Sequence, residues 1–154
     1  MRTIFLIMIG LSVAWSQNIG IVHDTKTGLD WQDNYSNNGD NIKYSNWTEA
    51  IAYCEALTLG GYADWRLPNI NELKSIIVKT NYNYYSSVRL GFVTIVPVYN
   101  YTPEAYTDRD YWSSTTHAKY SNTAVWVMDF GYGFSDIGGK TIGSHYVRCV
   151  REGQ

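Results

Sequence analysis

The chain has 154 residues, of which 12 are basic and 14 acidic. A mildly acidic chain of this kind is a poor candidate for binding nucleic acid or another strongly anionic partner. Charged residues make up only 17% and aromatic residues 16%, so the composition favours a packed globular domain and excludes general disorder.

The N-terminal residues have the pattern of a secretory signal peptide. Arg2 precedes an apolar run over residues 4–15, and the small residues Ala14 and Ser16 stand where a signal peptidase reads the chain before Gln17. We therefore expect a signal peptide at residues 1–16 and a single exported domain at 17–154, either secreted or held in the periplasm or cell envelope. Cleavage would leave no membrane span. A membrane-anchored signal helix is the alternative, although the run is short for one.

The first elements of the domain are a hairpin and a polar loop. Short apolar runs at 19–23 and 29–31 flank a polar turn that ends in Gly28, and this pattern predicts a hairpin. Residues 33–41 are rich in Asn, Asp, Ser and Gly and have a faint likeness to a calcium loop. The twelfth position of that loop is Ser45, where an EF-hand needs a bidentate Glu. We therefore expect a solvated loop and no metal site.

Two helices are predicted between residues 46 and 73, joined by an extended bridge at 65–68. Asn46 with Glu49, and Asn69 with Glu72, have the spacing of a capping box. A pair of glycines at 60–61 is expected to end the first helix. The apolar face of that helix consists of Trp47, Ala50, Ile51, Cys54 and Leu57, at helical spacing.

Strands are predicted mainly in the C-terminal part of the chain. Residues 81–110 have no sustained period, although 93–98 could supply one short strand. Residues 111–116 are aromatic and β-branched, and residues 124–130 alternate with a period of two. A glycine-rich turn is expected over 131–139 and a final strand over 146–151. Helices followed by strands predict an α+β fold.

Cys54 and Cys149 are the two cysteines of the chain. Export would place them in an oxidising compartment, so a disulfide is expected between the first helix and the last strand. Two buried free thiols are the alternative.

Four runs resemble the Lcl C-terminal domain family, which is named after the C-terminal domain of a bacterial collagen-like adhesin. The most specific run extends from Ala50 to Leu73, and the others are residues 28–32, 111–115 and 146–151. They follow the family's order and cover nearly all of residues 28–151. The family is similar to the C-type-lectin-like superfamily. The bridge at 66–68, followed by a helix, and the terminal pair at 148–149 also resemble formylglycine-generating enzyme.

The resemblance implies a C-type-lectin-like fold, with two helices packed on a small, mainly antiparallel sheet and a long irregular loop region. In such folds a disulfide joins the first helix to the final strand, as expected here. By analogy, residues 81–110 correspond to the loop region where these folds bind ligands.

The predicted ligand-binding residues lie in that segment. Tyrosine presents a flat apolar ring with a polar tip, which suits a glycan or a protein surface. Two arginines could add contacts to an anionic sugar, because the collagen-like adhesin's own domain is implicated in binding sulfated glycans. The alternative is that several of the rings cover the core beneath a long loop. The residues are Tyr82, Tyr84, Tyr85, Arg89, Tyr99, Asn100, Tyr101, Tyr106, Asp108 and Arg109.

No catalytic, metal or cofactor site is predicted. Formylglycine-generating enzyme depends on active-site cysteines, and this chain has no third cysteine. The histidines, His23, His117 and His145, have no metal-ligand spacing. Calcium-dependent lectins carry Glu-Pro-Asn or Gln-Pro-Asp, whereas this chain has Thr-Pro-Glu at 102–104.

The remaining motif residues are expected to be structural. Trp31, Trp65, Trp112 and Trp126 are predicted to lie in the core, with Pro68 setting the bridge before the second helix. Arg66 is expected to form an ion pair or a set of carbonyl contacts, because a charge in an apolar bridge is rarely buried alone.

Together these patterns predict an exported ligand-binding domain without enzymatic activity, acting in adhesion or in recognition of a glycan or protein surface at the bacterial cell envelope. A structural or protein-interaction module, which could be homo-oligomeric, is the alternative. An uncharacterised enzyme is the third.

Overall fold

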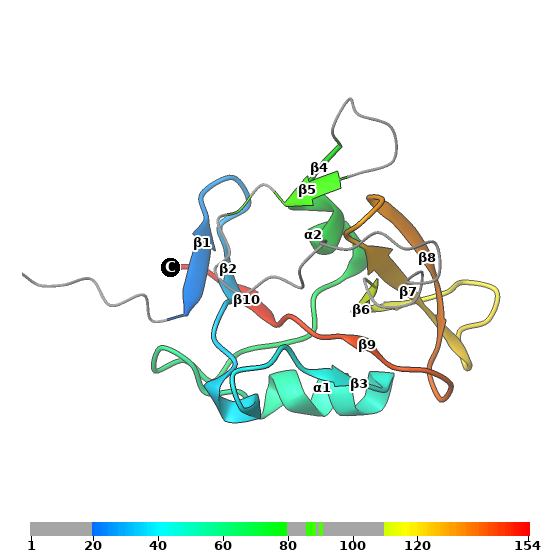
Figure 1. Ribbon diagram of the computed structural model, residues 1–154, viewed down its shortest axis with the longest axis horizontal. Coiled ribbons are helices and arrows are strands. Elements are labelled where there is room, and N and C mark those ends of the chain that lie inside the picture. Colours follow the sequence, from blue (N-terminus) through cyan, green and yellow to red (C-terminus); the bar gives the residue numbers. More distant parts are fainter. Residues whose placement is uncertain (1–19, 80–85, 89, 91–109) are drawn as a thin grey trace, which may run out of the picture.

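The computed structural model describes residues 20–79, 86–88, 90 and 110–154 (Figure 1). They form two α-helices, a short 3-10 helix and three sheets. The helices are α1 (Trp47–Glu55) and α2 (Ile70–Ser75), and the 3-10 helix is η1 (Ser36–Asn38). The α+β class and the two predicted helices are confirmed.

The largest sheet has five strands in the order β3-β9-β6-β7-β8. They are β3 (Tyr44–Ser45), β9 (His145–Tyr146), β6 (Asp110–Thr116), β7 (Ala124–Asp129) and β8 (Phe134–Gly139). A second sheet pairs β1 (Ile21–Asp24), β2 (Leu29–Gln32) and β10 (Val150–Glu152), and a third pairs β4 (Ile77–Lys79) with β5 (Ser86–Val88). Apart from the parallel pair β6–β9, the ladders are antiparallel.

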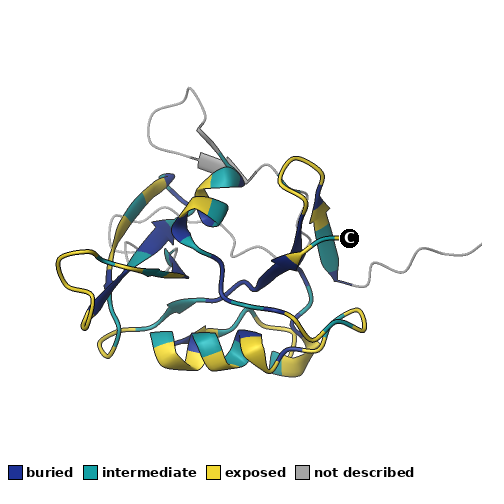
Figure 2. Ribbon diagram, turned by 180° about the vertical axis from the view of Figure 1, so that it is seen from behind, coloured by how far each residue is buried: buried dark blue, intermediate teal, exposed yellow. Residues whose placement is uncertain are grey.

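The two helices pack on opposite faces of the five-stranded sheet. Because successive strand residues point to opposite sides, Trp112 and Val127 face the cluster around α1, whereas Tyr111 and Met128 face the cluster around α2. Buried residues gather along these strands, while the outer side of α1 is exposed (Figure 2). The α1 cluster contains Ala50, Cys54, Leu57, Trp65, Leu67, Val125, Val147 and Cys149, and the α2 cluster contains Leu29, Trp31, Ile70, Leu73, Ile76 and Val150.

The predicted caps are present at both helices. The side chain of Asn69 accepts hydrogen bonds from the N–H groups of Asn71 and Glu72, and Glu72 in turn accepts from the Asn69 N–H, which completes a capping box. At α1 the structure shows the first half of the box, from the Glu49 N–H to Asn46. Helix α1 ends at Glu55, before the glycines expected to stop it. These glycines have φ of +65° and +82° and instead turn the chain between the bridging residues at 59 and 62.

The N-terminal hairpin is confirmed as β1–β2, with Val22 opposite Trp31. Its turn closes through a hydrogen bond of 2.8 Å from the Gly28 N–H to the Asp24 carbonyl. The buried Asp24 carboxylate also accepts from the Lys26 N–H. Gly28 has φ of +73°, which explains why the turn ends in glycine.

The glycine-rich stretch at 131–139 was wrongly predicted as a turn throughout. The turn occupies only residues 130–133, and Phe134–Gly139 is β8, which pairs with β7 at all six positions. Gly138 is needed for packing, because a Cβ at this residue would lie 2.5 Å from the ring of Trp112. Gly138 is therefore explained by its close packing against Trp112 and not by a turn.

The predicted final strand divides between two sheets. Strand β9 pairs with β3 and β6, while β10 pairs with β2. Between them the chain is held by bonds from the Val147 N–H to the Lys43 carbonyl and from the Gln32 N–H to the Cys149 carbonyl. Strand β5 was also missed, because it lies in the segment predicted to lack a period. The strand considered at 93–98 and the signal peptide at 1–16 lie outside the described residues.

Candidate functional site

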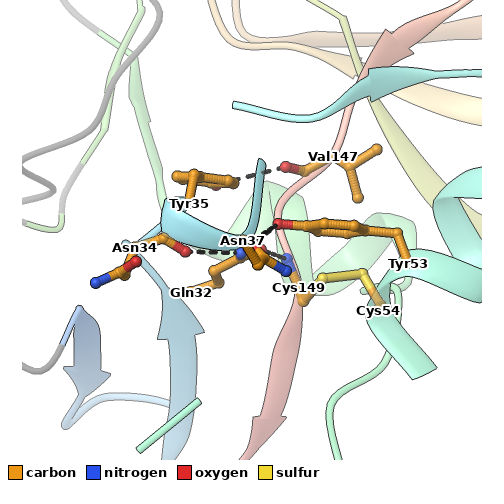
Figure 3. Close-up of a disulfide and its surroundings, with 8 residues drawn as sticks. All are labelled: Gln32, Asn34, Tyr35, Asn37, Tyr53, Cys54, Val147 and Cys149. Atoms are coloured by element: carbon orange, nitrogen blue, oxygen red, sulfur yellow. Dashed lines mark hydrogen bonds between the residues drawn. A yellow bond between two sulfur atoms is a disulfide. The ribbon is translucent and has the colours of Figure 1, made fainter. Parts of the chain in front are cut away.

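The disulfide between Cys54 and Cys149 joins α1 to the crossing between β9 and β10 (Figure 3). Both cysteines are fully buried, and the bond closes a sequence separation of 95 residues. The pairing expected from the sequence is therefore present. The disulfide therefore fixes α1 to the segment that connects β9 and β10.

A buried amide supports the disulfide (Figure 3). The Gln32 Nε2 donates to the Tyr53 hydroxyl at 2.8 Å and to the Asn34 carbonyl at 2.9 Å, while its Oε1 accepts from the Cys149 N–H at 3.3 Å. The Tyr53 hydroxyl in turn donates to the Oδ1 of Asn37 in η1. Burial raises the pKa of the Tyr53 hydroxyl, which remains a neutral donor. These bonds connect β2, α1 and the C-terminal segment.

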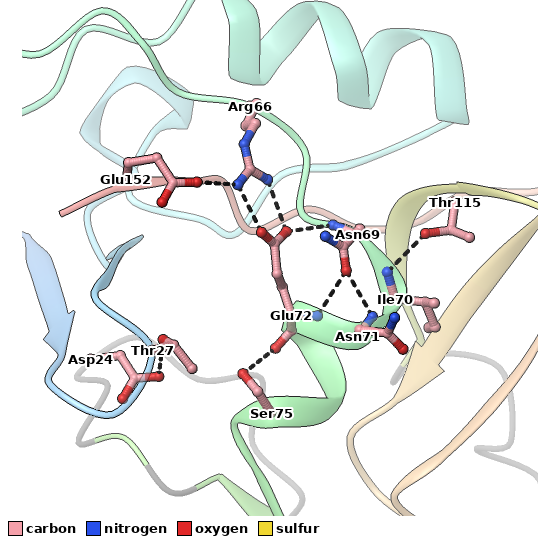
Figure 4. A network of polar contacts seen from close by, with 10 residues as sticks. All are labelled: Asp24, Thr27, Arg66, Asn69, Ile70, Asn71, Glu72, Ser75, Thr115 and Glu152. Carbon is pink, nitrogen blue, oxygen red and sulfur yellow. Dashed lines mark hydrogen bonds and ion pairs between the residues drawn. The ribbon is translucent and has the colours of Figure 1, made fainter.

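Arg66 organises the start of α2 (Figure 4). Its guanidinium binds both carboxylate oxygens of Glu72, at 2.8 and 2.7 Å, and reaches Glu152 of β10 at 3.0 Å. Desolvation acts to raise the pKa of Glu72, but the bonds from Arg66 and from the Asn69 N–H outweigh it and lower that pKa. Arg66 thus links the bridge, the capping box and the last strand, which is a structural role.

Two further arginines, for which the sequence analysis predicted no structural role, hold the C-terminal segment. Arg148 is buried, and its Nη1 donates to the Gln32 carbonyl at 2.7 Å and to Asp33 at 3.3 Å. Arg151 binds Asp30 at 2.8 Å and Asp64 at 2.7 Å. The sequence did contain a signal for these ion pairs, namely two arginines inside an apolar strand-like run. A buried charge needs a partner, so such arginines predict buried ion pairs.

The tryptophans fit the core prediction except at one position. Trp31, Trp65 and Trp112 are buried, whereas Trp126 is only partly buried. Trp126 lies opposite Ile137 on β8, the edge strand of the sheet within the described residues. Pro68 is buried, and its carbonyl accepts a hydrogen bond from the Ser114 N–H of β6 at 2.8 Å.

All ten predicted ligand-binding residues lie outside the described residues. Tyr82, Tyr84, Tyr85, Arg89, Tyr99, Asn100, Tyr101, Tyr106, Asp108 and Arg109 therefore remain predictions.

A hollow of about 400 Å³ lies between α2 with the start of β4 on one side and the β7–β8 hairpin on the other. Phe134 is the exposed aromatic residue at its edge, and the ring of Tyr132 stacks on it with centroids 5.8 Å apart. Lys74 brings a cation from the last turn of α2. The lining residues are Lys74, Ile77, Met128, Gly133, Phe134 and Ser135. A hollow whose lining includes an exposed aromatic residue and an amine is suited to binding a ligand.

Three carboxylates and an imidazole share the α1 side of the sheet. Asp110 lies directly opposite Asp129 across β6 and β7, and Asp136 follows on β8. Burial raises the pKa of Asp110 to about 7, and the two neighbouring carboxylates add to the rise. The Nδ1 of His145 lies 3.9 Å from Asp110, and burial lowers the pKa of that imidazole. The carboxyl group of Asp110 can therefore take up a proton near neutral pH.

The described residues contain neither a metal site nor a membrane-spanning helix. No three side chains among His, Cys, Asp and Glu meet there as a metal site. Within the same ranges, no helix has the length and apolar character needed to cross a membrane.

A model of the Lcl C-terminal domain matches residues 20–151, a span that includes both helices and both cysteines. No curated protein and no solved structure matches the chain, so the likeness to C-type lectins stays a prediction. The match covers most of the sequence, and the chain therefore belongs to the Lcl C-terminal domain family.

Proposed function

We propose that this chain is an exported ligand-binding domain that acts in adhesion or recognition at the cell surface or in the envelope, and that it is not an enzyme. The family takes its name from the C-terminal domain of a bacterial collagen-like adhesin, which supports a role at the surface. The intramolecular disulfide supports export, because such bonds persist in oxidising compartments.

The observation that carries the proposal is the hollow beside α2. Exposed aromatic rings bind the apolar faces of sugars and the side chains of partner proteins at little entropic cost. Phe134 offers such a ring, Tyr132 backs it, and Lys74 stands within the same hollow. A ligand with an apolar face and a polar or anionic edge fits this combination.

The scaffold holds this hollow in place. Glu72 lies on α2, two residues before Lys74, and is held by both the capping box and the bidentate bond to Arg66. A binding residue on a fixed helix needs less ordering when a ligand arrives. The predicted tyrosines lie between β4 and β6 in the sequence, and we propose that they also contact the ligand.

The first experiment screens the oxidised domain, residues 17–154, on a glycan array and in pull-downs from envelope and surface extracts. Hits should weaken on Phe134→Ala and Lys74→Ala, and also on Tyr99→Ala and Tyr101→Ala. Tyr44→Ala is the matched control, because Tyr44 is also an exposed aromatic residue but lies on β3, at the opposite edge of the sheet. Sugar hits unaffected by all four substitutions would contradict the proposal.

A protein-interaction module of the envelope is the second candidate function. It is favoured by the exposed aliphatic side chain of Ile137 on β8, which suits a protein partner better than a sugar. A silent array together with a reproducible protein partner would select it. An enzyme is the remaining alternative, and turnover abolished by Asp110→Asn would favour it, because Asp110 titrates near neutral pH.

A further inference from the structure

Strand β8 forms one edge of the five-stranded sheet. It is hydrogen-bonded to β7 at all six positions, without a bulge. Among residues 20–79, 86–88, 90 and 110–154, no segment pairs with its other side (Figure 1). Such an edge presents a row of backbone N–H and C=O groups that fit another strand.

Strand β8 and the turn that follows it carry several exposed hydrophobic side chains. In the described part of the chain, five large hydrophobic side chains are exposed, and three of them fall within residues 134–142. They are Phe134, Ile137 and Ile142, with 53%, 46% and 80% of their surface accessible. Edge strands are usually protected by charged side chains, proline or a bulge; β8, with the sequence Phe-Ser-Asp-Ile-Gly-Gly, has no proline and no bulge, and its one charged residue is Asp136.

We propose that β8 is a self-association edge, which pairs antiparallel with β8 of a second copy of this chain. Two identical edges join in this way through a two-fold axis perpendicular to the sheet. The axis keeps each face of the sheet continuous, so residues that point to the same face oppose one another. The central registers are then those in which Asp136 or Ile137 lies opposite its own counterpart.

The charge on β8 selects between these registers. An axis at Asp136 sets two carboxylates directly opposite each other, an arrangement that destabilises a strand pair. An axis at Ile137 packs the two isoleucines together and places Asp136 opposite Gly138 of the second copy, while Ser135 meets Gly139. The isoleucine-centred register therefore satisfies the edge without a like-charge contact.

The pairing is weak in dilute solution. A few strand residues bury less area than a stable interface requires, so association depends on concentration. A dense surface or an anchored chain supplies the high local concentration that such a contact needs. Ile137 does not line the hollow beside α2. Ile137→Lys therefore changes the proposed contact between copies without replacing a residue that lines the hollow.

Cysteine cross-linking tests the register in the mature chain under mild oxidation. Ile137→Cys should give a covalent dimer through residue 137, located by peptide mapping. Ser135→Cys should not, because four residues of offset separate its two copies by about 13 Å along the strands. A monomeric Ile137→Cys variant, or a dimer formed by Asp136→Cys instead, would overturn this register.

Sedimentation of the uncross-linked chain tests the association itself. The wild type should dimerise reversibly at hundreds of micromolar, and Ile137→Lys should weaken the dimer at least tenfold. Ile142→Lys is the control, because Ile142 is more exposed but follows the end of β8. Ile137 is half-exposed, so its replacement leaves the core intact, and circular dichroism checks the fold. A wild type that stays monomeric at about 1 mM, or equal dimerisation of all three proteins, would overturn the proposal.

Discussion

Removing the disulfide is the perturbation whose size follows most directly from the structure. The bond between Cys54 and Cys149 spans 95 residues. In the chain-entropy model, a loop of this length contributes about 4 to 5 kcal/mol to the free energy of unfolding. Replacing both cysteines by alanine also removes two buried sulfurs, which adds about 1 kcal/mol for each. A domain of this size has about 5 to 15 kcal/mol in total, so little stability should remain.

Urea titration followed by tryptophan fluorescence measures this loss. With a slope of about 1 to 3 kcal/mol per molar urea, the midpoint of the double variant should fall by at least about 2 M. The wild type reduced with dithiothreitol separates the two contributions, because it loses the cross-link but keeps both sulfurs. A midpoint within about 0.5 M of the oxidised wild type would refute the reasoning, since the staple would then add almost nothing.

Three further substitutions test the scaffold. Arg66→Leu removes the bidentate partner of a half-buried carboxylate and should cost about 1 to 2 kcal/mol in urea titrations, with a smaller loss for Arg66→Lys; unchanged stability together with lost binding would contradict the structural role. Because burial raises the pKa of Asp110 to about 7, from 3.8, stability should fall as pH rises between these values. Solvent screens this partly exposed group, so we expect about 1 to 2 kcal/mol, and Asp110→Asn should abolish the slope; a slope retained in that variant would assign it to other groups. Gly138→Ala would place a Cβ 2.5 Å from the Trp112 ring and should cost about 1 to 3 kcal/mol by calorimetry, whereas Gly139→Ala, with its nearest atom at 3.4 Å, should cost less.

Local signals predicted the helices and the first hairpin well, because each depends on neighbouring residues. Asn69 and Glu72 satisfy the capping box within four residues of chain, and Gly28 closes its turn within five. The disulfide was predictable for a different reason. Two cysteines in an exported chain leave a single intramolecular pairing.

Strand β8 could not be predicted, because its cause lies in the tertiary structure. Asp136 and the two glycines disfavour a strand by local preference. Strand β7 provides a complete partner for them, and the ring of Trp112 occupies the space that a side chain at 138 would fill. Contacts between distant residues therefore decide this element, and no alternation in the sequence marks it.

The break in the last strand has a similar origin. The run at 146–151 contains Tyr146, Val147 and Val150 and was predicted as one strand, but its two ends pair with different sheets. Buried Arg148 lies between them, with partners on the segment after β2. None of the residues that line the hollow was predicted as a site residue, since the hollow combines α2 with a hairpin whose second strand was expected to be a turn.

The most direct test of ligand recognition is a calorimetric titration of the recovered ligand against the oxidised domain. The account predicts that Phe134→Ala binds at least tenfold more weakly, about 1.4 kcal/mol, while Tyr44→Ala binds as the wild type does. Equal affinity of Phe134→Ala and the wild type, with binding lost on Tyr44→Ala, would place the ligand at the opposite edge of the sheet and contradict the account.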